Sequence, residues 1–309
     1  MLLDYVISID VGGTTIHAAI LSDGVIHTKT ITTYDSLANK DKHVIINHLK
    51  NIVEDQMKQI LKLQMNETIK IKGVGIAFPG PADYNEGISY IKGLEKYDSL
   101  YKVNIKNELF NTISDNHFIT KYLSKKFSIH MGNDATLFAV GEFIKYKDKG
   151  FQKIACFTLG TGIGSTFICE GRVVKGEFGI PNSGFIYNAP FKQGIIEDYI
   201  SKKGISNLAL QHGFYSDTNV KELAELANDG HIDAKKVFSD FGIWLAEAVN
   251  PFIESFKPEI IVFGGQISKS FKQFESSFSE NIIYTSELNV EVSDTPLIST
   301  FIGANNLIN

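Results

Sequence analysis

The chain has 309 residues, of which 43% are hydrophobic and 21% are charged, and its formal net charge is -5. This composition is typical of a soluble globular protein, and the length predicts one large or two medium domains. A net acidic chain lacks the basic surface expected of proteins that bind nucleic acid or anionic membranes. No apolar stretch reaches the roughly 18 residues that suggest a membrane span.

The two cysteines, Cys156 and Cys169, are too few for a disulfide framework or a four-thiolate metal site. An acidic residue, Asp4, lies where a secretory signal would need basic and then apolar residues. We therefore expect a cytoplasmic protein without a nucleic-acid or membrane partner.

The first third of the chain alternates apolar runs with short polar breaks. Residues 5–33 read as a strand, the break "DVGGTT", a second strand, an "SDG" turn and a third strand, which predicts an antiparallel meander. Apolar residues at helical spacing predict a long helix at 43–63, and a strand follows at 69–78 until "PGP" ends it.

A shorter helix at 103–113 and a strand at 127–131 then lead to "GNDATLFAVGEFIKY". Asn133 and Asp134 lie where this last helix would be capped, because Asn and Asp are favoured at helix N-termini.

The same plan restarts at Ile154 with "IACFTLGTGIGSTFICEGRVVKGE", again a strand, a glycine break, a strand, an acid-Gly turn and a strand. Gly160 and Gly171 follow Gly13 and Gly24 at one common interval, so the register of the repeat agrees. An interval of this length predicts two similar domains and not a solenoid. We place them at 1–131, with 297–309 packing back as a helix, and at 132–296.

The rest of the second half is mainly helical. A helix is expected through 237–256, followed by a buried strand at 259–265 whose glycine pair opens another helix at 268–278.

The three glycine breaks "DVGGTT", "LGTGIGS" and "FGGQ" could each cradle a phosphate, because glycine lets several backbone N–H groups approach one point. A single break of this kind is more often a tight turn. "GTGIGS" is not the dinucleotide motif G-x-G-x-x-G, and a strand follows it where a helix would be needed. No G-x-x-x-x-G-K-[ST] occurs, which excludes a P-loop. With these two nucleotide motifs excluded, the remaining interpretation is a duplicated pair of hairpins that could hold a nucleotide from two sides.

"IDVGGTT", "GNDATLFAVGE", "GTGIG" and "IIVFGG", in this order, resemble the ROK family of sugar kinases and repressors, within the actin, hexokinase and heat-shock ATPase fold. The resemblance extends over nearly the whole chain. It implies an α/β protein with two RNase H-like (actin-like ATPase) domains and a central cleft, each domain a mixed five-stranded sheet flanked by helices. It also implies a homodimer.

The resemblance implies an ATP site and a bound Mg²⁺ near Asp10. The family usually has a basic residue shortly after the first loop, where this chain has His17. The remaining nucleotide-binding residues that the resemblance implies come from the three glycine breaks: Gly12, Gly13, Thr14 and Thr15, then Gly160, Thr161 and Gly162, and finally Gly264 and Gly265.

Phosphoryl transfer to a sugar hydroxyl needs a carboxylate that receives the proton. Asp134 is the candidate base, and its spacing alone fits an ordinary helix cap equally well. The resemblance of "NDA" to the family favours the catalytic role and implies that Asn133 binds the sugar. It also implies sugar-side roles for Gly80 in "FPGP" and Glu197 in "GIIEDYIS".

The family's Gly-Glu-x-Gly-His element and its zinc-binding cysteine cluster are missing. The corresponding stretch, "GIPNSGFIYNAPFKQGIIEDYIS", contains no histidine and no cysteine, so we expect no zinc. Asn182 and Ser183 are neutral hydrogen-bonding candidates for the sugar in its place, with Tyr187 as a packing surface.

The leading hypothesis is an ATP-dependent, glucokinase-like kinase of a hexose or N-acetylhexosamine. A sugar-sensing regulator or degenerate family member without kinase activity is the alternative, although no N-terminal segment long enough for a helix-turn-helix precedes the first strand. A third hypothesis is an ATPase of the wider fold that acts on a protein partner. The identity of the sugar stays open.

Overall fold

The computed structural model describes residues 2–64, 68–216, 218–283 and 288–308. The chain divides into two compact units, residues 1–141 with 297–309 (unit 1) and residues 142–296 (unit 2). No helix among these described residues is both long and apolar enough to cross a membrane.

Unit 1 is built on a mixed sheet in the order β3-β2-β1-β5-β8, with β4 paired to β2 as an additional strand. β1 and β2 are antiparallel, which confirms the predicted meander. β5 and β8 run parallel to β1, so the sheet is mixed, as the family resemblance implied. The strands are β1 (Leu2–Val11), β2 (Thr15–Ser22), β3 (Val25–Ile26), β4 (Thr32–Asp35), β5 (Thr68–Phe78) and β8 (Leu123–Asn133).

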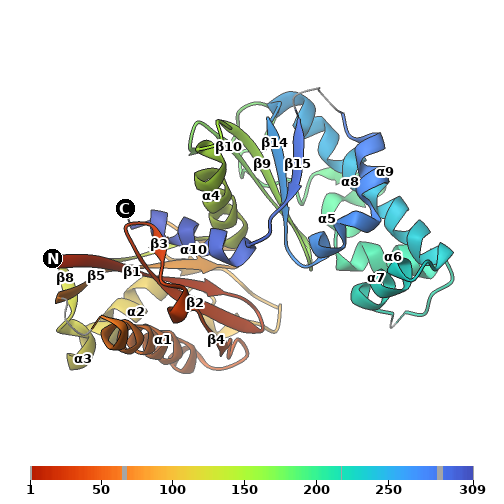
Figure 1. Ribbon diagram of the computed structural model, residues 1–309. Coiled ribbons are helices and arrows are strands. Elements are labelled where there is room, and N and C mark those ends of the chain that lie inside the picture. The colour runs from red at the N-terminus through yellow and green to blue at the C-terminus, as the bar shows by residue number, and fades with distance from the viewer. Residues whose placement is uncertain (1, 65–67, 217, 284–287, 309) are drawn as a thin grey trace. The chain divides into compact units, whose positions relative to one another are not determined.

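Helices cover both faces of this sheet (Figure 1). Side chains of α1 (Lys42–Leu63) and α2 (Ile105–Ser114) pack against one face, which carries Ile16, Ala18 and Ile20. Because side chains alternate along a strand, Ala19 and Leu21 lie on the other face, where they contact Phe301 of α10 (Pro296–Asn306). The C-terminal helix therefore belongs to the core of unit 1.

Glycine lets α10 approach the sheet closely. A Cβ atom on Gly75 of β5 would lie 2.0 Å from the backbone oxygen of Ala304, so no larger residue fits there. Ser8 Oγ donates a hydrogen bond to Phe301 O at 2.9 Å and holds the same helix in register.

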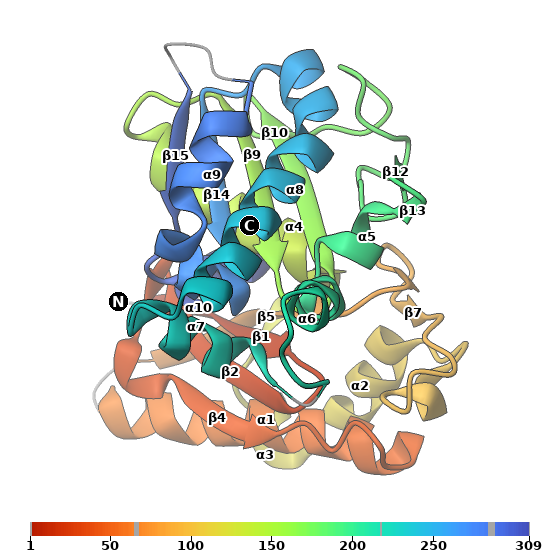
Figure 2. The same cartoon turned by 90° about the vertical axis from the view of Figure 1, so that its right-hand side faces the viewer.

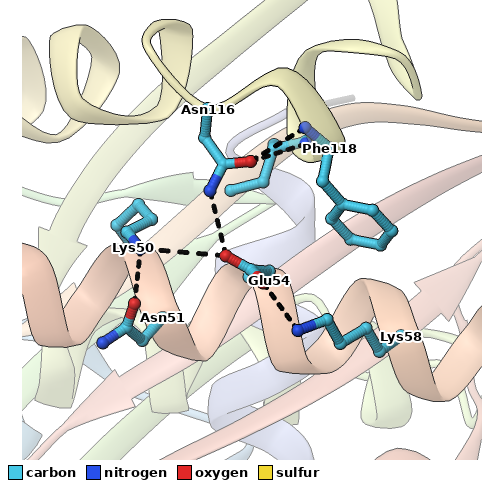
Figure 3. Close-up of polar contacts among 7 residues, drawn as sticks. Lys50, Asn51, Glu54, Lys58, Asn116 and Phe118 are labelled. Carbon is cyan, nitrogen blue, oxygen red and sulfur yellow. Dashed lines mark hydrogen bonds and ion pairs between the residues drawn. The ribbon is translucent and has the colours of Figure 1, made fainter.

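On the opposite face, α1 is joined to the short helix α3 (His117–Thr120) by polar contacts around Glu54 (Figure 3). Asn116 donates from Nδ2 to Glu54 Oε2 at 2.9 Å, while its Oδ1 accepts from the backbone N–H groups of Phe118 and Ile119. Lys58 pairs with Glu54 at 2.6 Å, and this hydrogen bond lowers the pKa of the Glu54 carboxyl. Asn116 therefore caps α3 and fixes it to α1 at once.

Unit 2 repeats the plan with the strand order β11-β10-β9-β14-β15. β9 and β10 are antiparallel, and β9, β14 and β15 are parallel, so the repeat predicted from the register of the glycine breaks is confirmed. The strands are β9 (Lys153–Leu159), β10 (Ile163–Cys169), β11 (Arg172–Val173), β14 (Ile260–Gly264) and β15 (Asn289–Val292).

Figure 2 looks onto the face of this sheet that α8 (Ile232–Phe256) covers. Phe157, Phe167 and Phe263 of the sheet lie in one apolar core with Phe241 and Phe256 of α8. Such fully buried aromatic side chains contribute on the order of 2 kcal/mol each through removal from water.

One predicted helix of unit 2 is wrong in its continuity. Residues 268–278 fall in two elements, the 3-10 helix η3 (Ile267–Gln273) and α9 (Glu275–Asn281), because Phe274 between them has non-helical torsion angles (φ -125°, ψ 4°). Within η3, Ser270 also departs from helical torsion angles. The remaining short elements include β12 (Pro190–Phe191), β13 (Gly194–Ile195), α5 (Ile196–Tyr199), α6 (Lys202–Gln211) and α7 (Val220–Asn228), and in unit 1 β6 (Ala82–Asp83), β7 (Ile88–Ser89), η1 (Thr28–Thr30) and η2 (Asp98–Leu100). Residue 309, the last of the expected C-terminal helix, lies outside the described residues.

Candidate functional site

The carboxyl-terminal edge of the sheet in unit 1 gathers several predicted site residues. β1, β5 and β8 are parallel neighbours, so their C-terminal ends lie at one edge, where ligands of α/β sheets usually bind. Asp10 is paired with Ala77, and Phe78 is paired with Asn133. Neighbouring strands lie about 4.8 Å apart, so Asp10 and Asn133 are separated by about two strand spacings along this edge.

Asn133, and not Asp134, supplies the usual side-chain cap of α4 (Asp134–Lys147). Asn133 Oδ1 accepts from the backbone N–H of Thr136 at 3.0 Å, three residues on, which is the typical N-cap bond. Asp134 is the first helical residue, and its Oδ1 accepts from Ala135 N at 2.9 Å and from Asn133 Nδ2 at 3.0 Å. The capping interpretation of Asp134 is therefore not needed to explain the helix start.

Asp134 and Asp10 form an electrostatically coupled pair. Although Asp134 reaches solvent, the surrounding protein withdraws its carboxylate from bulk water, and this desolvation raises its pKa. Desolvation first, and the negative charge of Asp134 second, raise the pKa of Asp10 to about 7. Two carboxylates that repel each other in a partly dry site suit a hard divalent cation with oxygen ligands, such as Mg²⁺.

The first glycine loop presents donors without acceptors. Its carbonyls are occupied: Gly12 O accepts from Tyr97 Oη at 2.8 Å, Gly13 O from Ser36 Oγ at 3.2 Å, and Thr14 O from Ser36 N at 3.0 Å. Within the described part of the chain, the backbone N–H groups of Gly13 and Thr14 donate to no protein acceptor. An anion such as phosphate is the complement of such a loop.

Close approach explains the glycines of this loop. A Cβ atom on Gly12 would lie 2.8 Å from Thr15 O, which accepts the hydrogen bond of Gly12 N at 3.0 Å. At Gly13, a Cβ atom would meet the side chain of Lys96, with Cδ at 2.8 Å and Nζ at 3.0 Å. Lys96 therefore lies directly against the loop.

His17 does not supply a cation next to the loop. Its Nε2 is hydrogen-bonded to Thr15 Oγ1 at 3.3 Å and its Nδ1 to Thr33 Oγ1 at 3.0 Å. Partial burial lowers the pKa of the ring, so the neutral form predominates near pH 7.

Gly80 lies beside Asn133 and a tyrosine that the sequence interpretation missed. A Cβ atom on Gly80 would be 3.1 Å from Tyr84 Oη and 4.0 Å from Asn133 Nδ2. Asn133 Nδ2 donates to Tyr84 Oη at 3.2 Å, and burial raises the pKa of this phenol to about 12, so it stays protonated. Tyr84 follows the "PGP" turn by three residues, which is the only sequence signal for it.

In unit 2, the second glycine loop is tied to Glu197. Gly160 N donates to Gly162 O at 3.0 Å, and Lys202 N donates to Gly160 O at 2.8 Å. The Glu197 carboxylate accepts from the backbone N–H of Ile163, and a Cβ atom on Gly162 would lie 1.9 Å from Glu197 Oε2. Burial raises the pKa of Glu197 in spite of this hydrogen bond.

The third glycine break contacts β9, the strand that leads into the second glycine break. Gly265 has φ +89°, and a Cβ atom on it would lie 2.4 Å from Leu159 O, so glycine is required for both reasons. Gly264 ends β14 and is paired with Thr158 of β9. The second and third breaks therefore form one continuous surface of unit 2.

A cavity of about 630 Å³ opens on this surface. Its volume falls within the range of small-molecule sites. The lining comes from the second loop, the start of α6, the whole length of α7, η3 and the residues that precede α7 and η3: Gly160, Thr161, Lys202, Asn219, Val220, Lys221, Ala224, Glu225, Asn228, Gln266, Ile267, Lys269 and Ser270. Most of these residues carried no recognisable sequence signal.

Asn182, Ser183 and Tyr187 lie in an exposed stretch of unit 2. Ser183 Oγ accepts from Phe185 N at 3.2 Å, and a Cβ atom on Gly176 would lie 2.6 Å from Asn182 Oδ1. Cys156 and Cys169 are free thiols. Across the residues with described positions, no group of three or more His, Cys, Asp and Glu side chains is arranged to hold a metal ion. A cation at Asp10 would therefore share its coordination with ligand or water oxygens.

Comparisons with known proteins agree with this arrangement. The chain is 27% identical over 300 residues to a glucokinase of Thermotoga maritima, which covers 90% of this chain and 86% of the relative. It is 28% identical over 159 residues to an N-acetyl-D-glucosamine kinase of Vibrio atlanticus, covering 46% of this chain and 52% of that protein.

Among solved structures, a ROK family glucokinase from Streptomyces griseus in complex with glucose and AMPPNP matches with a TM-score of 0.72 and 18% identity, covering 98% of both chains. A ROK family transcriptional regulator matches with a TM-score of 0.74 and 17% identity, covering 99% of this chain and 78% of that one. These likenesses show that the chain shares the fold of these two proteins.

A sequence model of the ROK family matches residues 6–293, nearly the whole chain. Together with the duplicated sheet and the matching glycine loops, this shows that the chain belongs to the ROK family.

Proposed function

We propose that the protein is an ATP-dependent kinase that transfers a phosphoryl group to a hydroxyl of a hexose or an N-acetylhexosamine. The observation that carries the proposal is the placement of Asp134 beside Asp10, in the same unit as a glycine loop with open N–H donors. Relatives that are kinases of glucose and of N-acetyl-D-glucosamine support these substrate classes.

Asp134 is the proposed general base. Transfer to a hydroxyl requires a carboxylate that accepts its proton, and a pKa raised by desolvation brings a carboxylate closer to the operating pH. The bonds from Asn133 Nδ2 and Ala135 N hold one carboxylate oxygen in a fixed direction. Asp134 is thus oriented before the substrate arrives, which lowers the reorganisation needed during transfer.

The nucleotide is proposed to contact the glycine loops of both units. In the first loop, the residues are Gly12, Gly13, Thr14 and Thr15; in unit 2, they are Gly160, Thr161 and Gly162, with Gly264 and Gly265. The cavity beside the second loop has room for a nucleoside. Asp10 would hold Mg²⁺, which when bound neutralises phosphate charge.

For the sugar, we propose contacts with Asn133, Glu197, Asn182 and Ser183 and close approach at Gly80, whose neighbour Tyr84 orients the Asn133 amide. We also propose that no zinc is needed, since the stretch 179–201 carries no Cys or His. One tightly bound equivalent of zinc in metal analysis would contradict this.

The alternative is a sugar-binding regulator without kinase activity. The fold match to a ROK transcriptional regulator is the observation that favours it. Sugar binding without release of ADP would support this alternative, whereas ATP hydrolysis that no sugar accelerates would support an ATPase.

The test is a coupled assay of ADP release over a panel of hexoses and N-acetylhexosamines with Mg²⁺. Asp134→Asn should lower kcat by about 10²–10⁴-fold while it leaves ATP binding intact, because an amide cannot accept the proton. Asp115→Asn changes an exposed aspartate at the end of α2 and serves as the matched control. Turnover by Asp134→Asn at the rate of the unchanged protein would overturn the assignment of the base.

A further inference from the structure

Lys96 lies against the first glycine loop, although no feature of the sequence points to it. Its Cδ and Nζ atoms lie 2.8 and 3.0 Å from the position that a Cβ atom on Gly13 would take. The aliphatic part of the side chain thus covers Gly13, and the ammonium lies beside the loop whose N–H groups at Gly13 and Thr14 are open.

The backbone around Lys96 is held in place by unusual local structure. Both of its neighbours, Glu95 (φ 58°) and Tyr97 (φ 61°), adopt left-handed conformations, which non-glycine residues rarely do. Tyr97 N donates to Ala38 O at 2.6 Å, and Tyr97 Oη donates to Gly12 O at 2.8 Å. Strain that persists at such positions is characteristic of functional segments.

The charge of the Lys96 ammonium is not neutralised by any acidic side chain among the described residues. In the part of the chain that the structure describes, it makes no ion pair and no side-chain hydrogen bond. Lys42 and Lys58 of unit 1 differ in this respect, because Lys42 pairs with Glu108 at 2.8 Å and Lys58 pairs with Glu54 at 2.6 Å. An unpaired ammonium beside open N–H donors makes the loop a strong anion site.

We propose that Lys96 is a phosphate-binding residue, which supplies at the first glycine loop a positive charge for the polyphosphate of the nucleotide. This inference rests on the proposed kinase function and adds a contact to it. The ring of His17 is hydrogen-bonded to Thr15 and Thr33, so Lys96 is the cation that lies on Gly13. Glycine at residue 13 would then be needed for two reasons. It lets the phosphate approach the backbone N–H group, and it leaves room for the Lys96 side chain, which a Cβ atom would meet.

Lys96→Met is the discriminating variant, because methionine keeps most of the aliphatic cover on Gly13 and removes only the charge. Lys92→Met is the matched control: Lys92 belongs to the same segment, and its Nζ lies over the Tyr101 ring at 5.2 Å. Lys96→Arg should retain binding, because a guanidinium also pairs with phosphate.

Isothermal titration with Mg²⁺-AMPPNP at low ionic strength measures the effect. We expect Lys96→Met to raise the Kd about five- to tenfold, to flatten its dependence on salt and to leave the Kd for adenosine unchanged, while Lys92→Met matches the unchanged protein. Thermal unfolding verifies that each variant is folded.

If Lys96→Met bound Mg²⁺-AMPPNP as tightly as the unchanged protein does, the role of Lys96 would be refuted and the kinase proposal would stand. A loss for adenosine equal to that for Mg²⁺-AMPPNP would also refute it, since the loss would then come from packing. If the unchanged protein bound no nucleotide, both this inference and the proposed function would fall together.

Discussion

The carboxylate of Glu197 lies directly against Gly162, so that any side chain at residue 162 would collide with Oε2. The same carboxylate accepts a hydrogen bond from the backbone N–H of Ile163. A residue proposed on the sugar side of the site is thus in contact with the loop proposed to bind phosphate.

Gly162→Ala should lower the stability of the protein by about 1–3 kcal/mol, because it forces Glu197 out of its position. In a Glu197→Ala background, the same substitution should cost much less, since the colliding oxygen is gone. Chemical unfolding of the four proteins in this double-mutant cycle measures the coupling. Gly160→Ala is the stability control, because a Cβ atom there meets nothing within 4 Å. Additive costs would show that the two residues are not coupled.

Asp10 makes the stability of the free protein depend on pH. Its pKa rises from 3.8 to about 7 on folding, so the folded state binds the proton more tightly and stability increases as the pH falls from about 7 towards 4. Asp10→Asn should remove this dependence and raise Tm above pH 7, by about 2–4 °C per kcal/mol recovered. Thermal melts between pH 4.5 and 8.5 without divalent cations measure this pH dependence. Equal slopes of Tm against pH for the unchanged protein and for Asp10→Asn would contradict the prediction.

The same environment should appear in the pH dependence of catalysis. Because the proposed base, Asp134, must be deprotonated to accept a proton, kcat/KM should rise with pH through a pKa that desolvation has raised above the usual value of an aspartate. A pH–rate profile measured with saturating Mg²⁺ would reveal this limb. An acid limb at or below the ordinary aspartate value would show that the carboxylate is hydrated in the active protein.

Tyr84→Phe should affect the sugar more than the nucleotide. Removing the hydroxyl takes away the acceptor of the Asn133 amide, and the loss of such a bond costs about 0.5–1.5 kcal/mol. The KM for the sugar should therefore rise severalfold at an unchanged Kd for Mg²⁺-AMPPNP. Tyr90→Phe, at an exposed tyrosine of unit 1, is the control. An equal rise for both variants would exclude a specific role of Tyr84.

Gly75→Ala should destabilise unit 1 by about 3 kcal/mol or more, because the new methyl group would collide with a backbone oxygen that cannot rotate away. Ser8→Ala removes one hydrogen bond to the same helix without added volume and should cost about 1 kcal/mol. Urea unfolding distinguishes the two. A similar small loss for both would show that α10 shifts to accommodate the methyl group.

The two meanders could be predicted because a strand, a glycine break and a second strand form a local pattern, and its recurrence from Gly13 to Gly160 is visible in the letters. The start of α4 was also predictable, since capping depends on adjacent residues. Which of Asn133 and Asp134 caps this helix could not be predicted, because either residue type can cap a helix. Only the observed hydrogen bond from Thr136 N to Asn133 Oδ1 identifies the cap.

The sequence by itself determined the duplicated fold class, the three glycine breaks and the carboxylates Asp10 and Asp134, because these depend on short motifs in which neighbours along the chain act together. Only the tertiary structure decided that Lys96 covers Gly13, that Tyr84 meets Asn133 and that Glu197 lies on Gly162. Each of these contacts joins residues far apart along the chain, and no local propensity records which side chains a folded chain brings within a few ångströms of each other.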